Sequence, residues 1–112
     1  MIGRPAGALW PFRDDNGKWW WCVVGSFMIG SYTVPDGFVT DLCSIPALLR
    51  WLLNPYAPDT APAGAGHDYL LKLGVEERVA AGLFYERMTL DGVWRPKRKA
   101  YFAGVLLASS GW

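Results

Sequence analysis

Three ionisable side chains are the best candidates for chemistry in this sequence: Asp41, His67 and Asp68. Asp41 lies where a short predicted strand gives way to a predicted helix, and a carboxylate there can accept backbone N–H bonds or face a cleft. His67 and Asp68 are adjacent in a later predicted helix. One histidine with two carboxylates could hold a divalent metal with open coordination positions. The same residues could instead form a hydrogen-bonded network in which Asp41 orients His67.

The chain contains a single histidine, which narrows the possible chemistry. A zinc site of the HExxH kind needs two histidines, and an HD phosphohydrolase needs more ligands than His67 and Asp68. A triad of Ser44, His67 and Asp41 is formally available, but the sequence lacks the GxSxG turn that presents such a serine. Cys43 could instead form a thiolate pair with His67. With one nitrogen donor zinc is a poor fit, so we expect neither a resident metal nor a cofactor.

Tryptophan is abundant, with seven among 112 residues, and 52% of the residues are hydrophobic against 19% charged. So little charge predicts a surface that is partly covered by a partner. Trp19, Trp20 and Trp21 fall in one predicted strand, where alternation places Trp20 on the face opposite the other two. In one interpretation Trp20 is core and the others shield the hairpin. In the other, the three residues bind a protein or a glycan through an aromatic face.

Four basic residues gather before the last predicted helix: Arg95, Lys97, Arg98 and Lys99. They form either a solvated turn or a site for phosphates. Cations at the start of a helix oppose its dipole, which leaves room for an anionic partner. The formal net charge of the whole chain is only +1, however, so no overall field attracts nucleic acid. We therefore expect no nucleic-acid partner.

The chain pattern predicts strands first and helices afterwards, which is typical of α+β domains. The predicted strands are 8–12, 19–24 and 27–34, followed by an extended segment at 38–39. Asn16 and Gly17 mark a hairpin between the first two strands. The predicted helices are 44–53, 61–73, 76–90 and 101–108. We expect one domain over residues 1–112, in which a small N-terminal antiparallel sheet packs on three or four C-terminal helices.

Two further expectations follow from local composition. Ala63, Gly64, Ala65 and Gly66 form a run of small residues, and glycines inside a helix indicate that another backbone or a ligand lies close by. No stretch reaches the roughly 18 apolar residues of a membrane span, so we expect no spanning helix. Cys22 and Cys43 lack CxxC spacing, and with no apolar leader at the start of the chain we expect both to be reduced thiols.

Two stretches of the sequence resemble a known family. Residues 34–46 read VPDGFVTDLCSIP, and residues 66–70 read GHDYL. Together they resemble the phage and prophage family known as domain of unknown function 1353, whose pattern is roughly VPxGFxTDxASxP followed by a helix with HDxLY. The resemblance runs over about residues 20–104. Cys43 stands where the family usually has Ala, and Gly82 lies near the place of a usual acidic residue. The resemblance implies a phage or prophage origin and no assigned activity.

With this resemblance, the sequence predicts a small phage-encoded accessory protein, a virion or tail component. We expect it to dock to other phage structural proteins, or to itself, in the host cytoplasm during assembly and then in the virion. The alternative is a small hydrolase, for example a metal-assisted enzyme directed at the cell wall, that uses Asp41, His67 and Asp68. We further hypothesise that His67 lies within hydrogen-bond reach of Asp41. Asp68, about 100° further round the helix, would then point elsewhere.

Overall fold

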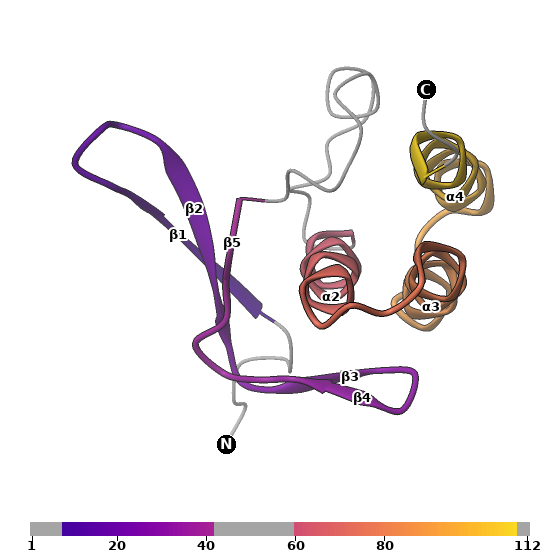
Figure 1. Ribbon diagram of the computed structural model, residues 1–112, viewed down its shortest axis with the longest axis horizontal. Coiled ribbons are helices and arrows are strands. Elements are labelled where there is room, and N and C mark those ends of the chain that lie inside the picture. The colour runs from indigo at the N-terminus through magenta and orange to yellow at the C-terminus, as the bar shows by residue number, and fades with distance from the viewer. Residues whose placement is uncertain (1–7, 42–59, 110–112) are drawn as a thin grey trace.

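The computed structural model describes residues 8–41 and 60–109. Within these ranges the chain forms strands first: β1 Ala8–Arg13, β2 Trp19–Val24, β3 Phe27–Ile29, β4 Tyr32–Val34 and β5 Val39–Thr40. Helices follow: α2 Ala61–Lys72, α3 Glu77–Leu90 and α4 Arg95–Ser109. This order confirms the predicted α+β class (Figure 1). The predicted helix 44–53 lies outside the described residues.

The N-terminal hairpin forms as the sequence predicts. Strands β1 and β2 pair antiparallel, with Arg13 opposite Trp19. In the turn between them Gly17 has a φ of 81°, and its N–H donates to the carbonyl of Asp14 at 3.0 Å. Strand β5 pairs antiparallel with the other edge of β2, which gives the order β1-β2-β5. The position of β1 at the edge explains why Pro11 is tolerated, since proline has no N–H to give to a further strand.

The single strand predicted over residues 27–34 is wrong. The structure folds this segment into a second hairpin, because β3 and β4 pair with each other in a separate two-stranded sheet. The chain reverses at Gly30, whose φ of 60° lies in the left-handed region that glycine enters without steric cost. A Cβ at Gly30 would also collide with the side chain of Leu83 in α3. The pair Gly30-Ser31, with glycine first, is itself a signal for a two-residue hairpin turn, so the sequence did contain a local mark of this reversal.

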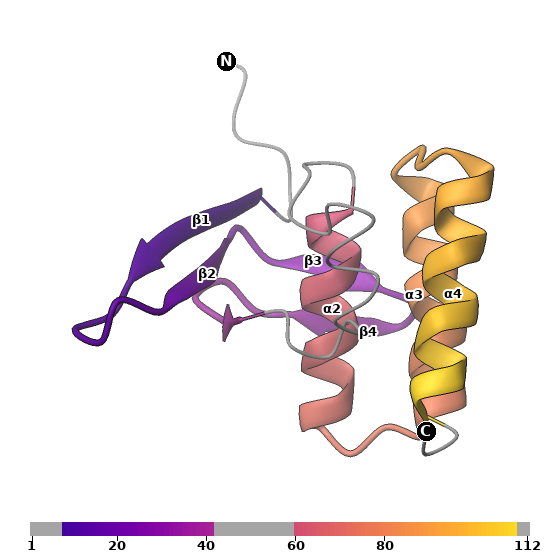
Figure 2. The ribbon, with the colours of Figure 1, turned by 90° about the horizontal axis from the view of Figure 1, so that it is seen from above.

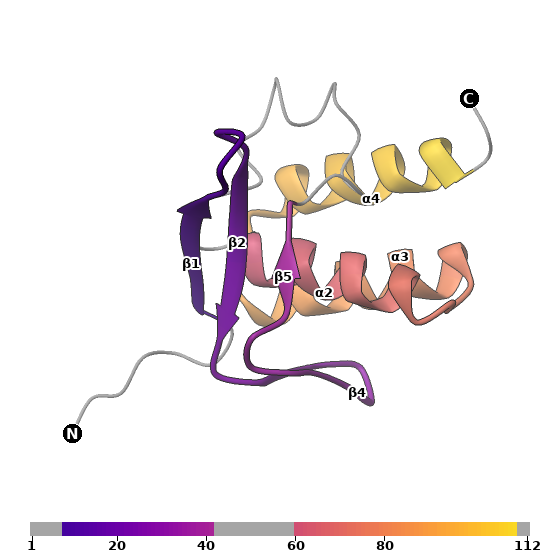
Figure 3. The ribbon, with the colours of Figure 1, turned by 60° about the vertical axis from the view of Figure 1, so that its left-hand side comes forward.

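Helix α2 lies between the three-stranded sheet and the outer helices, α3 and α4 (Figures 1 and 3), whereas β3 is in contact with both α2 and α3. Figure 2 shows α3 and α4 running side by side beyond it. One group of buried residues joins the strands to α2 and α3: Val23, Phe27, Ile29, Val34, Ala65, Leu70 and Ala80. A second group joins the three helices and the turn before α4: Ala63, Ala81, Phe84, Met88, Val93, Tyr101 and Val105. Both faces of α2 are therefore core.

The small residues of α2 allow a close approach of the second sheet. Ala63, Gly64, Ala65 and Gly66 are all buried. A Cβ added to Gly66 would lie only 2.7 Å from Cδ1 of Ile29 in β3. The close neighbour that the glycines predict is therefore a strand of the second sheet.

Helix α4 begins at Arg95, earlier than the predicted start at residue 101. Pro96 fits this first turn because the first N–H groups of a helix have no partner inside the helix. The sequence prediction instead places the basic residues in a turn before the helix. The structure holds the turn in place through Arg98, which donates to the hydroxyl of Tyr85 at 3.3 Å and to the carbonyl of Val93 at 2.9 Å.

Two smaller expectations can be compared with the structure. Cys22 is a free thiol, as predicted, and Cys43 lies outside the described residues. None of the helices in the described parts of the chain is long and apolar enough to cross a membrane.

Two glycines in helices should respond in opposite directions to a methyl group. Gly82 is exposed in α3, and a Cβ there would meet open space, so Gly82→Ala should stabilise the fold by about 0.5–1 kcal/mol. In Gly66→Ala the new methyl group would collide with Ile29, which should lower the free energy of unfolding by about 1–3 kcal/mol. Chemical denaturation of both variants measures the two changes. A stabilised Gly66→Ala would contradict the close approach of α2 and β3.

Candidate functional site

A buried hydrogen bond joins the two stretches that carry the family resemblance. Thr40, at the end of β5, donates its hydroxyl hydrogen to Oδ2 of Asp68 in α2 at 2.7 Å. Both side chains are buried. Lys72, one turn later in α2, places its ammonium nitrogen 3.6 Å from the same oxygen. A carboxylate is costly to bury unless it is hydrogen-bonded or paired, and these two neighbours satisfy that requirement.

His67 is packed inside the helical layer. Its ring centroid lies 5.2 Å from that of Phe84 in α3, and only 4% of the residue is exposed. Burial lowers the pKa of His67 to about 4, although the charge of Asp68 acts in the opposite direction. The imidazole is therefore neutral at physiological pH. A general base must reach the proton that it removes, so this degree of burial favours a packing role.

Asp41 is engaged with the N-terminal hairpin. Its Oδ2 lies 2.8 Å from the ammonium nitrogen of Lys18, just before β2. The same ammonium lies 4.4 Å from the centroid of the Trp20 ring, a cation–π arrangement. Asp41 is thus linked to the hairpin through Lys18, and its acceptance of backbone N–H bonds stays a prediction.

The three candidate residues have different neighbours in the structure. Asp68 contacts Thr40 and Lys72, Asp41 pairs with Lys18, and the ring of His67 lies against Phe84. Side chains at neighbouring positions of a helix point about 100° apart, which explains why those of His67 and Asp68 have different neighbours. Among residues 8–41 and 60–109, no group of three or more His, Cys, Asp or Glu could hold a metal ion. The contact between His67 and Asp41 stays a prediction.

The residue that sequence reasoning missed is Thr40. In the sequence Thr40 is simply one residue of the stretch 34–46, whereas the structure makes it the partner of Asp68. Strand alternation could have pointed to it: Val39 turns outward, so the next side chain must turn inward.

The model of one protein family matches residues 21–105, and that family is described as a protein of unknown function, DUF1353. The chain belongs to this family. The matched range agrees with the resemblance seen in the sequence, over about residues 20–104. Searches of the curated proteins and of the solved structures gave no match.

The DUF1353 chain has a second candidate site on the outer face of its three-stranded sheet. Side chains directly opposite one another in a sheet share a face. The register places Trp10 opposite Cys22, Phe12 opposite Trp20, and Val39 opposite Cys22 on the other side. Trp10 is 61% exposed and Phe12 39% exposed. We call these five residues the outer aromatic face.

The three consecutive tryptophans divide between the faces of β2 as alternation predicts. Trp21, and not Trp20, is the one that packs against the core. Trp20 lies on the outer face, where its indole N–H donates to Oδ2 of Asp14 at 2.9 Å. This hydrogen bond is the main reason why the pKa of Asp14 is lowered. Trp19 is exposed beside the turn, with the guanidinium of Arg13 5.5 Å from its ring centroid.

Removal of the Thr40 hydroxyl should weaken the joint between sheet and helix. Thr40→Val keeps the shape but leaves the buried Asp68 carboxylate without its donor, which should cost about 1–3 kcal/mol. Val39→Thr is the matched control, because Val39 is the exposed neighbour and should change stability by less than about 0.5 kcal/mol. Urea denaturation compares them. Equal effects would show that the hydrogen bond contributes nothing.

The stability of the fold should depend on pH through His67. Its pKa is about 4 when folded and near 6.5 when unfolded, so between these values the unfolded chain binds more protons. This stabilisation is complete above pH 6.5 and falls as the pH drops toward 4, by at most about 3 kcal/mol. The difference in unfolding free energy between wild type and His67→Gln should therefore shrink over that range. A difference that stays constant with pH would contradict a buried neutral imidazole.

Proposed function

We propose that this chain is a small phage-encoded accessory protein, a virion or tail component that works by docking. Its docking surface is the outer aromatic face, and its partners are other phage structural proteins or a second copy of the chain. The observation that carries this proposal is the exposure of Trp10 and Phe12, two large aromatic side chains on one face of one strand.

The chemistry of this face differs from that of a sheet surface adapted to water. An antiparallel sheet with one wet side normally places polar residues there. Here the outward positions hold Trp10, Phe12, Trp20, Cys22 and Val39. Aromatic side chains are enriched where proteins bind one another, because they offer a large apolar area with few rotatable bonds. The inner face of the sheet already supplies the core, through Val23 and Trp21. On the opposite face Trp10, Phe12 and Val39 keep a large part of their surface exposed.

The edge of the sheet favours docking through the face. Strand β1 is the edge strand of the order β1-β2-β5, and Pro11 in its middle removes one backbone donor. A proline on an edge strand discourages pairing with a further strand. A partner would therefore gain more from the aromatic side chains than from the backbone of β1.

The phage setting in this proposal rests on the resemblance of residues 34–46 and 66–70. In that setting the protein is made in the host cytoplasm and is then carried in the virion. No observation on the described residues favours the hydrolase alternative. His67 is buried against Phe84, and Asp68 is held by Thr40.

The outer aromatic face can be tested by substitution. Trp10→Ser with Phe12→Ser should abolish binding to the structural protein that wild type retains, when proteins encoded by the same phage genome are co-expressed and purified together. If the partner is a second copy, sedimentation should show that the variant has lost self-association. Both residues are exposed, so the thermal midpoint should change little.

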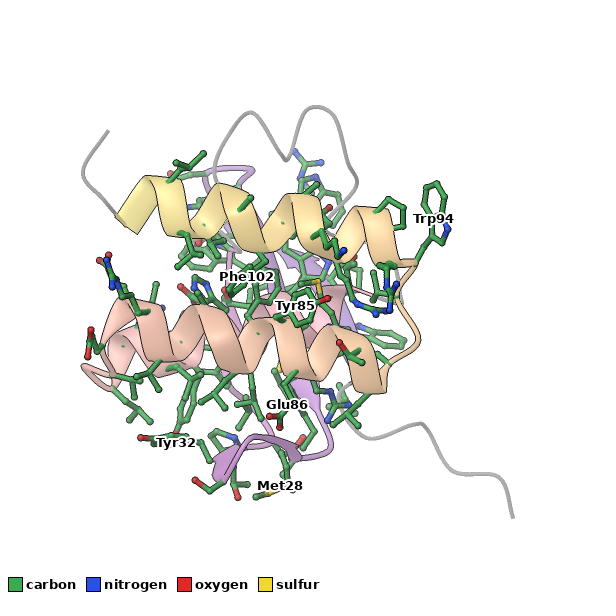
Figure 4. The ribbon with its side chains drawn as sticks, turned by 90° about the vertical axis from the view of Figure 1, so that its right-hand side faces the viewer. Met28, Tyr32, Tyr85, Glu86, Trp94 and Phe102 are labelled. Atoms are coloured by element: carbon green, nitrogen blue, oxygen red, sulfur yellow. The ribbon has the colours of Figure 1, made fainter. Side chains whose placement is uncertain are left out.

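The matched control for that experiment is Met28→Ser with Tyr32→Ser, which removes two exposed apolar side chains from the second sheet (Figure 4). This control should bind like wild type. A wild type that stays monomeric and retains none of the phage proteins would overturn the docking proposal. Equal losses in the two double variants would also do so.

A further inference from the structure

The turn between α3 and α4 presents two large apolar side chains to solvent. Leu90 ends α3 and is 74% exposed, and Trp94 precedes α4 and is 73% exposed. No other large apolar side chain in the described parts of the chain is as exposed as these two. Val93 between them is buried and anchors the turn in the helical core. Trp94 projects beyond the ends of both helices, so this corner of the molecule is convex (Figure 4).

Basic residues surround the same corner. Arg95, Lys97, Arg98 and Lys99 occupy the start of α4, and its first turn holds no acidic residue. Residues 92–112 contain these four basic residues and no acidic one, which gives +4, while residues 1–91 contain seven basic and ten acidic residues, which gives −3. The net charge of +1 therefore conceals a strong separation of charge along the chain.

The acidic residues near this corner do not cancel its charge. Asp91 is already paired with Arg87, with Oδ2 3.0 Å from Nε. Glu86 lies on the side of α3 that faces β3 and β4 (Figure 4). The positive potential acts on Tyr85. The hydrogen bond from Arg98 lowers the pKa of Tyr85, and the charges of neighbouring cations of α4 lower it further.

We propose that this turn binds the surface of a membrane that contains anionic lipids. Leu90 and Trp94 enter the headgroup region, and Arg95 and Lys99, which are four residues apart on one face of α4, contact the lipid phosphates. Tryptophan is favoured at the boundary between headgroups and acyl chains, and basic residues beside it add attraction to anionic lipids. This is binding at the surface, for which no spanning helix is needed.

The apolar residues at this corner favour a membrane over a nucleic acid. A groove for nucleic acid combines cations spread along the backbone with aromatic rings for the bases. At this corner the exposed cations Arg95 and Lys99 lie within one turn at the start of α4, and Leu90 offers nothing to a phosphate or a base. Further along the same face of α4 the exposed positions become Ala103 and Leu107. Burial of such apolar side chains in a bilayer lowers the free energy of binding, whereas a polynucleotide offers them no apolar interior.

This membrane surface is separate from the outer aromatic face and does not depend on it. The three-stranded sheet and the pair α3 and α4 lie on opposite sides of α2 (Figure 1). One side of the molecule could therefore hold a protein partner while the other side touches a membrane.

Cosedimentation of the full chain with vesicles tests the proposal. Binding should be absent with phosphatidylcholine alone, should appear when phosphatidylglycerol is added, and should weaken as salt rises. Arg95→Gln with Lys99→Gln should reduce the partition coefficient by about tenfold or more. Leu90→Ser with Trp94→Ser should reduce it comparably. All four residues are exposed, and circular dichroism checks that each variant is folded.

The matched control removes the same amount of charge elsewhere. Arg13→Gln with Arg78→Gln takes two exposed cations from the hairpin and from α3, and should leave vesicle binding unchanged. An equal loss in this control would mean attraction by net charge alone and would overturn the proposal. So would binding to phosphatidylcholine alone, or no binding to either vesicle. Binding of short single- and double-stranded DNA is measured with the same variants. DNA binding that needs Arg95 and Lys99, without vesicle binding, would assign the corner to nucleic acid instead.

Discussion

The arrangement of the fold depends on one buried polar contact, the hydrogen bond from Thr40 to Asp68. Strand β5 is only two residues long and pairs with β2 through Thr40 and Val39. So short a strand has little pairing energy of its own, and its side-chain bond to α2 fixes how the sheet meets the helices. A buried carboxylate without this donor would be costly, so sheet and helix must meet in one particular way.

The second sheet is attached by close packing and by an arginine. Ile29 lies against Gly66 of α2, where a side chain on the helix would not fit. Arg87 of α3 donates to the carbonyl of Met28 at 2.8 Å, and its guanidinium carbon lies 4.9 Å from the centroid of the Phe27 ring. Because α2 is in contact with strands on one side and with helices on the other, its small residues set the spacing of both layers.

This central position of α2 leaves the two proposed binding surfaces at the two sides of the molecule. The residues that first suggested chemistry, His67 and Asp68, lie in α2 and are used for packing and for the joint to β5. Trp10 and Phe12 lie on the outer face of the sheet, and Trp94 lies at the end of the outer helices (Figure 4). Such a distribution is typical of a protein that works through contacts made by its surface, with a rigid interior that positions them.

The sequence by itself determined the features that depend on local chemistry. Asn16 and Gly17 marked the first hairpin, Gly74 marked the end of α2, and the strands-then-helices pattern predicted the α+β class. Only the tertiary structure decided the features that depend on distant neighbours. In the packed structure Gly30 lies against Leu83 of α3. The first turn of α4 is held by the contact of Arg98 with Tyr85. Likewise the partner of Asp68 is Thr40, 28 residues away. Turn signals and periodicity act over a few residues, whereas a collision or a buried hydrogen bond exists only once the layers have packed.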